Sequence, residues 1–404
     1  MPAILKREHF ALYALLTSLT AISIDALLPG LRSIEAQMGA SNLFTGHHII
    51  TIFIAGMALG ELFLGPLSDA IGRKNALLIG LGIYLLGTII ALVAGSLEMV
   101  VLGRFLQGAG VAGPKIATRA MIRDQFEGAA MARIMSFMFT LFILIPMLAP
   151  LLGQSLLAIS GWRGIFALYL GLALCLSFWL SKRQAETLPK ARRIPFRPGL
   201  LYRNALRILG NRRAALLIAA TGLIFGAQLL YLSTAADLFF DIYAIQALFP
   251  LYFACLAAGI AIASFLNAKL VQRVGMERMV QSALLAMVLI GLLMLGAAAF
   301  WAGRPPLGVF MGLGFAGFFA IGILFGNLNA MTMLGLGKLA GLGASLIASG
   351  SSLIAAVFAA GFASFYSETT FYFAAGFLAA ALSATALVAL SKSGAQAEIE
   401  PLRA

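Results

Sequence analysis

The sequence predicts an all-α integral membrane protein whose twelve transmembrane helices form two pseudo-symmetric six-helix bundles. Of its 404 residues, 61% are hydrophobic and 11% are charged, whereas a soluble domain is about half apolar and about a quarter charged. Apolar runs of about 20 residues recur along the chain, and about 20 residues of helix cross a bilayer core. The runs are continuously apolar rather than alternating, which favours helices over the strands of a closed barrel.

The apolar runs fall into two sets of six. The helices are predicted at residues 10–31, 46–67, 75–96, 98–120, 134–158, 162–181, 214–236, 246–268, 279–301, 307–330, 341–364 and 371–391. Residues 1–181 are therefore expected to form the N-terminal bundle. Residues 214–404 are expected to form the C-terminal bundle and a short cytoplasmic tail.

The segment between the two sets, residues 182–213, is the longest polar stretch of the chain. It contains ten basic residues, three prolines and a single acid, Glu186. We expect a basic cytoplasmic linker that fixes topology and tethers the two bundles. Binding to anionic lipid headgroups is the alternative function for so many basic side chains.

The basic residues also predict the orientation of the chain. With both termini in the cytoplasm, 23 of the 28 basic residues lie on the cytoplasmic side. The outer side carries Arg32, Arg163 and Arg304, and the membrane interior carries Arg104 and Lys115. This asymmetry follows the positive-inside rule, so the net charge of +13 indicates membrane topology rather than nucleic-acid binding.

The two halves contain a weak internal repeat. The segment 268–275 lies 203 residues after the segment 65–72 and keeps Leu270 and Gly275, although Gln272 replaces the earlier acid. A repeat at half the chain length is typical of transporters that are built from two parallel halves.

Four ionisable residues lie inside predicted helices of the first half: Asp25, Glu61, Arg104 and Lys115. Charges inside a membrane are costly, so each is a candidate functional residue that needs a partner. Asp25 and Arg104 each lie about six residues, ~9 Å, below the outer ends of their helices, which allows a pair. Glu61 and Lys115 both lie nearer the cytoplasmic end, which allows a second pair.

These pairs have two possible roles. They either hold the bundle together, or Asp25 or Glu61 exchanges protons, because burial favours a neutral carboxyl group and a nearby cation favours a charged one. Arg104 and Lys115 are eleven residues apart, about three helical turns, and so point the same way. Glycines at 103, 108, 110 and 113 on the same helix would let neighbouring helices approach closely.

The second half carries no charge well inside its helices, and its polar residues are the remaining candidates for a cavity. Gln228, Tyr231 and Asn327 form either interhelical hydrogen bonds or part of a substrate cavity. The predicted cavity set is Asp25, Arg104, Lys115, Gln228, Tyr231 and Asn327. The chain has no phosphate-binding loop and three histidines without metal-ligand spacing, so we expect no metal or cofactor.

The segment from Gly65 to Lys74 separates two apolar runs and is expected to form a compact charged turn. Its pattern, Gly-x-Leu-x-Asp-x-x-Gly-Arg-Lys, resembles the signature between helices 2 and 3 of the major facilitator superfamily. The matching positions are Gly65, Asp69, Gly72, Arg73 and Lys74. That signature normally has Arg or Lys after the acid, where this chain has Ala70.

Further segments resemble motifs of drug:proton antiporters. Asp25 to Pro29 resembles the helix 1 motif Asp-x-x-x-Pro. Arg104 to Gly110 resembles the helix 4 motif Arg-x-x-Gln-Gly-x-Gly, whose arginine is implicated in proton transfer. The helix 5 antiporter motif is matched by a segment with Pro146, Pro150 and Gly153, residue types that allow a helix to bend.

With Gly161-Trp162-Arg163, these segments together resemble the Bcr/CflA (bicyclomycin/chloramphenicol resistance) branch of the superfamily. The resemblance implies a proton-coupled secondary transporter that exports small amphipathic molecules, drugs or metabolites such as siderophores, by alternating access. It also implies a monomer in the bacterial inner membrane, powered by the proton gradient. Glu61 stands where this branch usually has Gln, which adds an ionisable site.

Asp25, Glu61 and Arg104 are thus the predicted proton-coupling residues. Two alternative functions remain open: a proton-coupled importer of a small nutrient, and a non-transporting membrane sensor. A membrane-embedded enzyme is disfavoured, because the sequence places no nucleophile, base or metal cluster at one depth.

Overall fold

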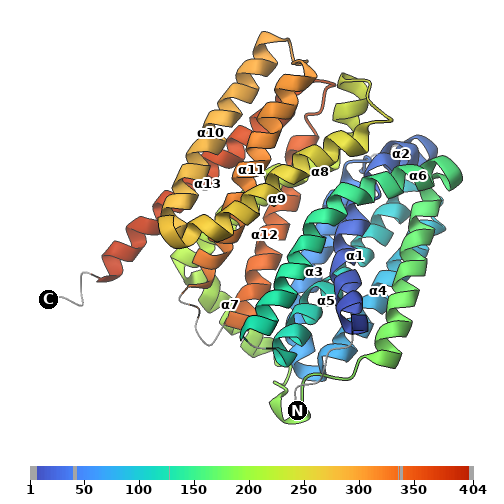
Figure 1. Cartoon of the computed structure of the whole chain (residues 1–404), viewed down its shortest axis with the longest axis vertical. Coiled ribbons are helices and arrows are strands. Elements are labelled where there is room, and N and C mark those ends of the chain that lie inside the picture. Colours follow the sequence, from blue (N-terminus) through green and yellow to red (C-terminus); the bar gives the residue numbers. More distant parts are fainter. Residues whose placement is uncertain (1–6, 40–42, 127, 335, 337–339, 400–404) are drawn as a thin grey trace. The chain divides into compact units, whose positions relative to one another are not determined.

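The computed structural model describes residues 7–39, 43–126, 128–334, 336 and 340–399, and this part of the chain contains helices and no strands (Figure 1). The chain divides into two compact units, residues 1–197 and residues 198–404. Both units are all-helical, as the composition predicts. Three basic residues of the topology count, Lys6, Lys338 and Arg403, lie outside the described residues.

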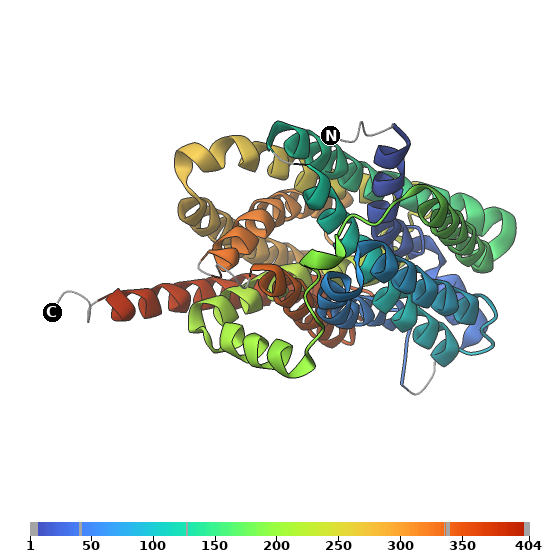
Figure 2. The same ribbon diagram turned by 90° about the horizontal axis from the view of Figure 1, so that it is seen from below.

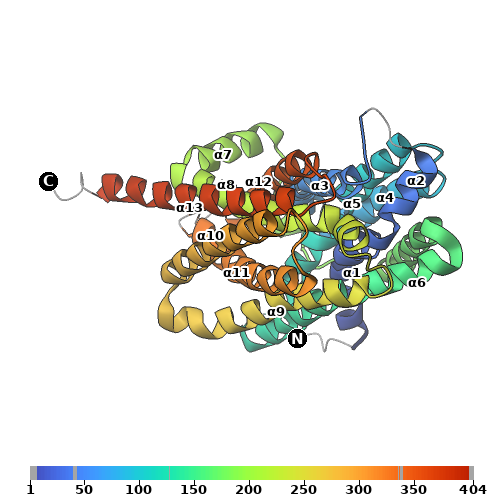
Figure 3. The same cartoon turned by 90° about the horizontal axis from the view of Figure 1, so that it is seen from above.

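Unit 1 contains the first half of the helices. They are α1 (Arg7–Asp25), η1 (Leu28–Gly30), α2 (Leu31–Met38), α3 (His48–Ile71), α4 (Arg73–Leu92), α5 (Leu97–Gln125), α6 (Gly128–Arg183) and η2 (Lys190–Arg192). Both η1 and η2 are short 3-10 helices. At one end of the unit, α2 lies beside α6 (Figures 1 and 3).

Unit 2 contains the second half. Its elements are α7 (Pro198–Gly210), α8 (Arg212–Asp237), η3 (Leu238–Ile242), α9 (Phe249–Val274), α10 (Met276–Phe300), α11 (Leu307–Met333), α12 (Ala340–Ala363) and α13 (Phe371–Ile399). The short element η3 is a π-helix that continues α8.

The described helices account for twelve membrane spans. Ten segments are long and apolar enough to cross a bilayer. An eleventh span is α5, which has 29 residues, about 43 Å of helix, but carries more charge. The twelfth arises within α6, because Gly161 (φ 68°, ψ −174°) divides that helix into two segments. The predicted fold class is thus confirmed.

Close packing of α5 against α3 and α4 organises unit 1. A Cβ atom on Gly108 would overlap the carbonyl oxygen of Phe53 on α3, and one on Gly110 would overlap the backbone nitrogen of Tyr84 on α4. The predicted glycine face of this helix therefore brings three backbones together, as small residues do between membrane helices.

The expected turn from Gly65 to Lys74 is wrong in its extent. Helix α3 continues through Pro66 to Ile71, and α4 begins at Arg73. Only Gly72 leaves the helical conformation, with φ 103° and ψ 156°, a region open essentially to glycine alone. A single glycine therefore makes the bend that we assigned to a ten-residue turn.

A single glycine also makes the bend between α9 and α10 in unit 2. Gly275 has φ 87° and ψ 146°, and its carbonyl accepts from Met279 N at 3.2 Å, as Gly72 accepts from Ala76 N at 3.2 Å. The weak repeat in the sequence thus corresponds to a repeat in the backbone.

The predicted linker 182–213 is largely helical. Helix α6 extends to Arg183, and η2 and α7 also fall within the segment. The division between the two units lies at residues 197 and 198, inside the segment.

Candidate functional site

Asp25 is the last residue of α1 and lies inside the first membrane span, where its side chain is buried. The helix stops there because Pro29 has no N–H to donate to the Asp25 carbonyl four residues earlier. The chain then passes through a 3-10 turn, in which Gly30 N donates to the Leu27 carbonyl at 2.9 Å. The Asp-x-x-x-Pro motif thus places a carboxyl group at an interruption of a transmembrane helix.

The antiporter stretch of α6 packs directly against this interruption. A Cβ atom on Gly153 would overlap the carbonyl of Ala26, the residue after Asp25. Both Pro146 and Pro150 lie in the same helix, one to two turns before Gly153. The structure therefore brings together two motifs that are more than 100 residues apart in the sequence.

The allowed pair between Asp25 and Arg104 is not formed. Of the described cations, none lies within ion-pair distance of the Asp25 carboxylate. Arg104 is fully buried and instead turns towards α3, where its Nε donates to the Ile49 carbonyl at 3.4 Å. Its guanidinium also lies 4.1 Å from the ring centre of Phe53. The depths of Asp25 and Arg104 along their helices permit the pair, but the direction in which the Arg104 side chain leaves α5 determines its partners.

A buried polar network connects Arg104 to α4. Arg104 Nη1 donates to Gln107 Oε1 at 2.8 Å, and Gln107 Nε2 donates to Thr88 Oγ1 at 2.7 Å. Thr88 in turn donates to the Tyr84 carbonyl at 2.7 Å. Within the described part of unit 1, Arg104 Nη2 has no hydrogen-bond partner, so the two N–H groups of this nitrogen are unused donors.

The network continues to α1. The Tyr84 and Ser23 hydroxyls are 2.7 Å apart, and Ser23 already donates to the Leu19 carbonyl, so Tyr84 is the donor to Ser23. Tyr169 on α6 donates to the Ile22 carbonyl at 3.1 Å. The last turn of α1, which ends at Asp25, is therefore held by hydroxyl groups from α4 and α6.

The tyrosines and the threonine of this network were not predicted from the sequence. Tyr84 and Thr88 are four residues apart, a spacing that puts two polar side chains on one face of an otherwise apolar helix and was a usable signal. Tyr169 is a lone polar residue in an apolar run, and no local pattern marks it.

The second allowed pair is present. Lys115 Nζ lies 2.5 Å from Glu61 Oε1, which joins α5 to α3. The Glu61 side chain is 0% exposed and that of Lys115 is 23% exposed, so the acid is interior and the base reaches its edge. Lys115 Nζ is also 3.6 Å from the Met57 sulfur.

The signature segment forms a cluster around Arg73. This guanidinium bonds to Ser68 Oγ at 2.8 Å, to Asp124 Oδ2 at 3.1 Å and to Asp69. The motif therefore links the end of α3, the start of α4 and the end of α5. Lys74 Nζ also donates to the Ser181 carbonyl at 2.8 Å.

Glu186 completes this cluster and was missed. Its carboxylate accepts from the backbone nitrogens of Arg73 at 2.9 Å and of Lys74 at 3.2 Å. A carboxylate at a helix N-terminus is stabilised by the free N–H groups and by the helix dipole. The single acid of the basic linker is therefore the cap of α4.

The three candidates of unit 2 have different surroundings. Tyr231 is buried among aromatic rings, with Phe318 at 4.9 Å and Phe253 at 5.6 Å between ring centres. Asn327 donates to Asn267 Oδ1 at 2.6 Å, an interhelical bond between α11 and α9. Gln228 is half-buried on α8. Packing and hydrogen bonding account for Tyr231 and Asn327, and a role in a cavity stays a prediction for all three.

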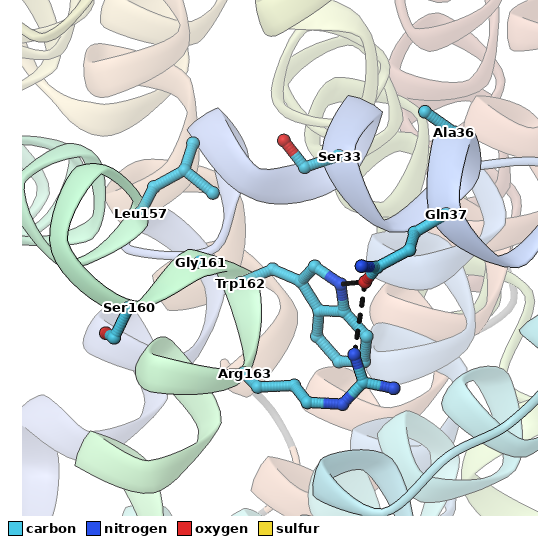
Figure 4. Close-up of a pocket in the computed structure, with 8 residues that line it drawn as sticks. All are labelled: Ser33, Ala36, Gln37, Leu157, Ser160, Gly161, Trp162 and Arg163. Atoms are coloured by element: carbon cyan, nitrogen blue, oxygen red, sulfur yellow. Dashed lines mark hydrogen bonds between the residues drawn. The ribbon is translucent and has the colours of Figure 1, made fainter.

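A surface pocket of about 520 Å³ lies between α2 and the kink of α6 (Figure 4). The side chains of Trp162 and Arg163 both point towards Gln37, whose Oε1 accepts from Trp162 Nε1 at 2.6 Å and from Arg163 Nη1 at 3.1 Å. The Gly-Trp-Arg motif thus fixes the turn at Gly161 to α2. None of the predicted coupling or cavity residues lines this pocket.

Comparisons with known proteins relate these features to a family. The model of the Major Facilitator Superfamily matches residues 13–359. A bicyclomycin resistance protein homolog of Haemophilus influenzae is 29% identical over 299 residues, which cover 73% of this chain and 74% of that protein. Multidrug resistance protein MdtL of Escherichia coli is 30% identical over 171 residues, 42% of this chain and 44% of MdtL. The solved structure of the human organic anion transporter MFSD10 has the same fold, with a TM-score of 0.66 at 19% identity, covering 95% of this chain and 98% of that one.

Proposed function

The chain belongs to the Major Facilitator Superfamily, and we propose that this transporter exports small amphipathic molecules in exchange for protons. The observation that carries the proposal is the buried carboxyl group of Asp25 at the break between α1 and η1. An ionisable group inside a membrane segment is a functional candidate by default. The relatives named for bicyclomycin and multidrug resistance support export of drug-like molecules.

In the proposed mechanism, protonation of Asp25 alternates with occupation by substrate. A buried carboxyl group without a cation is tolerated as the neutral acid, and its negative form needs a partner. Arg104 on α5, whose Nη2 has no partner among the described residues, is the group that we expect to stabilise the charged form when α1 shifts. We expect α1 to shift at this point, because its hydrogen-bonded backbone is already interrupted after Asp25.

Glu61 and Lys115 form the second proposed element of the mechanism. The pair keeps both charges neutralised inside unit 1. Protonation of Glu61 would release the partly exposed ammonium of Lys115, so this pair is the proposed secondary coupling site. In this scheme the two units alternate access to the substrate, and the transporter works as a monomer without a cofactor.

We place the transporter in the bacterial inner membrane with both termini in the cytoplasm. The support is the count of basic residues, with only Arg32, Arg163 and Arg304 assigned to the outer side. The bacterial relatives are consistent with this membrane.

The test is proton-driven accumulation of a fluorescent amphipathic dye, such as ethidium, in inverted membrane vesicles. We expect Asp25→Asn to reduce the proton-driven rate of dye accumulation more than about tenfold. The variant should still exchange dye without a proton gradient, since only the coupling of dye movement to protons is removed. The matched control is Asp241→Asn, the same chemical change in η3 and outside the proposed site. A fully active Asp25→Asn variant would remove Asp25 from the mechanism.

The direction of transport relative to protons has its own test in proteoliposomes of the purified protein. A dye gradient imposed across the liposome membrane should drive protons the opposite way, which a pH indicator inside the liposomes reports. An inward proton gradient should likewise drive dye outward. Movement of dye and protons in the same direction would show a symporter and overturn the export proposal.

A further inference from the structure

Helix α7 lies outside the proposed transport machinery and has an unusual distribution of side chains. It packs against α8 and α12 of unit 2, and among its side chains whose burial is described, Ile208 is the buried one. Figure 2 shows it along its length (light green), lying across the end of the unit rather than continuing α8. The remaining faces of α7 are therefore available to the surroundings.

One of these faces is apolar. Tyr202, Leu206 and Leu209 are 68%, 50% and 46% exposed. Their spacing of four and three residues puts them on one stripe, about 120° around the helix from Ile208. An exposed apolar stripe of this length on a short helix needs a partner of its own.

The adjacent face is basic. Arg203 and Arg207 are one turn apart and both exposed, and Arg212 and Arg213 are exposed just beyond the helix. The only acid in residues 182–213 is Glu186, and it is engaged by the N-terminus of α4. The positive charge around α7 is thus not compensated by acids of its own segment.

Connectivity fixes the level of α7 relative to the bilayer. Asn211 alone separates it from α8, and the membrane span of α8 begins at Arg212. Asn211 also caps α8, with its Oδ1 accepting from Ala214 N at 3.0 Å. A helix joined so tightly to the start of a span is held at the surface of the membrane.

We propose that α7 is an interfacial helix that binds anionic phospholipids. The stripe of Tyr202, Leu206 and Leu209 lies at the boundary of the acyl chains, and Arg203 and Arg207 bind headgroup phosphates. An amphipathic helix with basic residues beside its apolar face has the composition of such membrane-surface helices. This role requires only that the chain is embedded in a bilayer, and it is independent of export and proton coupling.

The first test maps the depth of α7 in the full-length protein. Single cysteines replace Tyr202, Arg203, Leu206, Arg207 or Leu209 in a Cys175→Ala, Cys255→Ala background, and each carries a spin label in lipid vesicles. Labels at 202, 206 and 209 should be relaxed by oxygen, and labels at 203 and 207 by a water-soluble nickel reagent. The matched control is Lys190→Cys on η2, which should be reached only by the water-soluble reagent. Access of the nickel reagent to all five positions would overturn the proposal.

The second test addresses the charge of the lipid. The spin label at residue 206 should lie deeper in the bilayer of vesicles that contain phosphatidylglycerol than in vesicles of phosphatidylcholine alone. Each arginine should contribute about a fivefold preference for the anionic surface, so Arg203→Gln with Arg207→Gln should abolish the difference. Equal removal of charge by Lys182→Gln with Arg183→Gln should leave the difference intact. Raising the salt from about 0.01 M to about 1 M, which shortens the Debye length from ~30 Å to ~3 Å, should reduce it.

Three results would contradict this proposal. Equal depth in both lipids would remove the role of the headgroups. Equal effects of the two double variants would show a general effect of charge. Protection of label 206 in native membranes that is lost in vesicles of purified lipid would indicate a protein partner instead.

Discussion

The ion pair between Glu61 and Lys115 shows what single side chains contribute inside a membrane protein. Both groups had to leave water, and their attraction offsets that cost only while both are present. Removal of one partner therefore costs more than removal of both. A stability measurement on the single and double variants therefore reports the structural contribution of the pair, whereas transport assays report its contribution to proton coupling.

We predict that Glu61→Gln lowers the stability of the purified transporter by about 3 kcal/mol, because Lys115 is left without its carboxylate. The double variant Glu61→Gln, Lys115→Met should recover most of the loss. The measurement is thermal unfolding in detergent, analysed as a double-mutant cycle. Additive effects of the two substitutions would show that the interaction between Glu61 and Lys115 contributes no free energy to stability. Glu277→Gln, which disrupts an exposed pair with Lys392 at 3.4 Å, is the control and should change little.

Single residues also show where sequence reasoning stops. The depths of Glu61 and Lys115 in their helices allowed a pair, and the structure forms it. The same reasoning for Asp25 and Arg104 allowed a pair that the structure does not form, because Arg104 turns towards Ile49 and Gln107. Depth follows from counting residues along a helix, whereas direction depends on which neighbouring helices pack where.

At the scale of helices, glycines determine how closely the elements of unit 1 approach. Gly108 faces the backbone of α3, whereas a Cβ added to Gly82 on α4 would have no atom within 4 Å. Alanine is the better helix former by about 1 kcal/mol, so the local preference is the same at both positions. Only the surroundings differ, which makes the two glycines a matched pair.

We predict that Gly108→Ala destabilises the protein by about 2 kcal/mol or more, since α5 must move away from Phe53. Gly82→Ala should be neutral or stabilise by up to about 1 kcal/mol. Apparent melting temperatures of the two variants provide the measurement. A similar change for both would mean that close packing of α3 and α5 does not limit stability.

The helix junctions at Gly72 and Gly275 provide a second matched pair. Both glycines have a positive φ that strains any other residue by about 1–3 kcal/mol. At Gly72 a Cβ would also collide with the Glu186 carboxylate, whereas at Gly275 nothing lies within 4 Å. Gly72→Ala should therefore lower the melting temperature more than Gly275→Ala.

The Glu186 contact can be isolated by combining substitutions. In the double variant Gly72→Ala, Glu186→Ala the collision is gone, so the combined loss should be smaller than the sum of the two separate losses. Strict additivity would contradict the contact between Glu186 and the start of α4.

Helix lengths were predictable because apolar runs report directly on membrane spans. The junction at Gly72 was not, because Gly65 and Pro66 resemble helix breakers although α3 accommodates both. Glu186 lies 113 residues from Arg73, and no local pattern connects them. Helix α7 had a usable signal in the spacing of Tyr202, Leu206 and Leu209, which the excess of basic residues in the segment obscured.

At the scale of the whole chain, two compact units account for the described helices, and the division between residues 197 and 198 lies in an exposed segment. In the first unit α5 packs against α3 and α4, and in the second α8 packs against α12 and α13. Each unit therefore has its own helical core, as the internal repeat in the sequence suggests.

We predict that fragments 1–197 and 198–404, expressed together, each insert into the membrane and resist proteolysis. A control split after Gly110, within α5, should yield degraded fragments, because it divides the helix on which unit 1 is built. Protease protection and the recovery of dye transport are the measurements. Loss of both intact fragments after the split at 197 would show that neither unit folds alone.

The junctions at Gly72 and Gly275 also bear on the ancestry of the protein. Duplication of an ancestral gene would have given both copies the same bend, and the nearly equal dihedral angles preserve it. In the first copy the bend is surrounded by Asp69, Arg73 and Glu186, whereas the second has Gln272 where the acid stood. The same bend therefore forms without the charged residues that surround it in the first half.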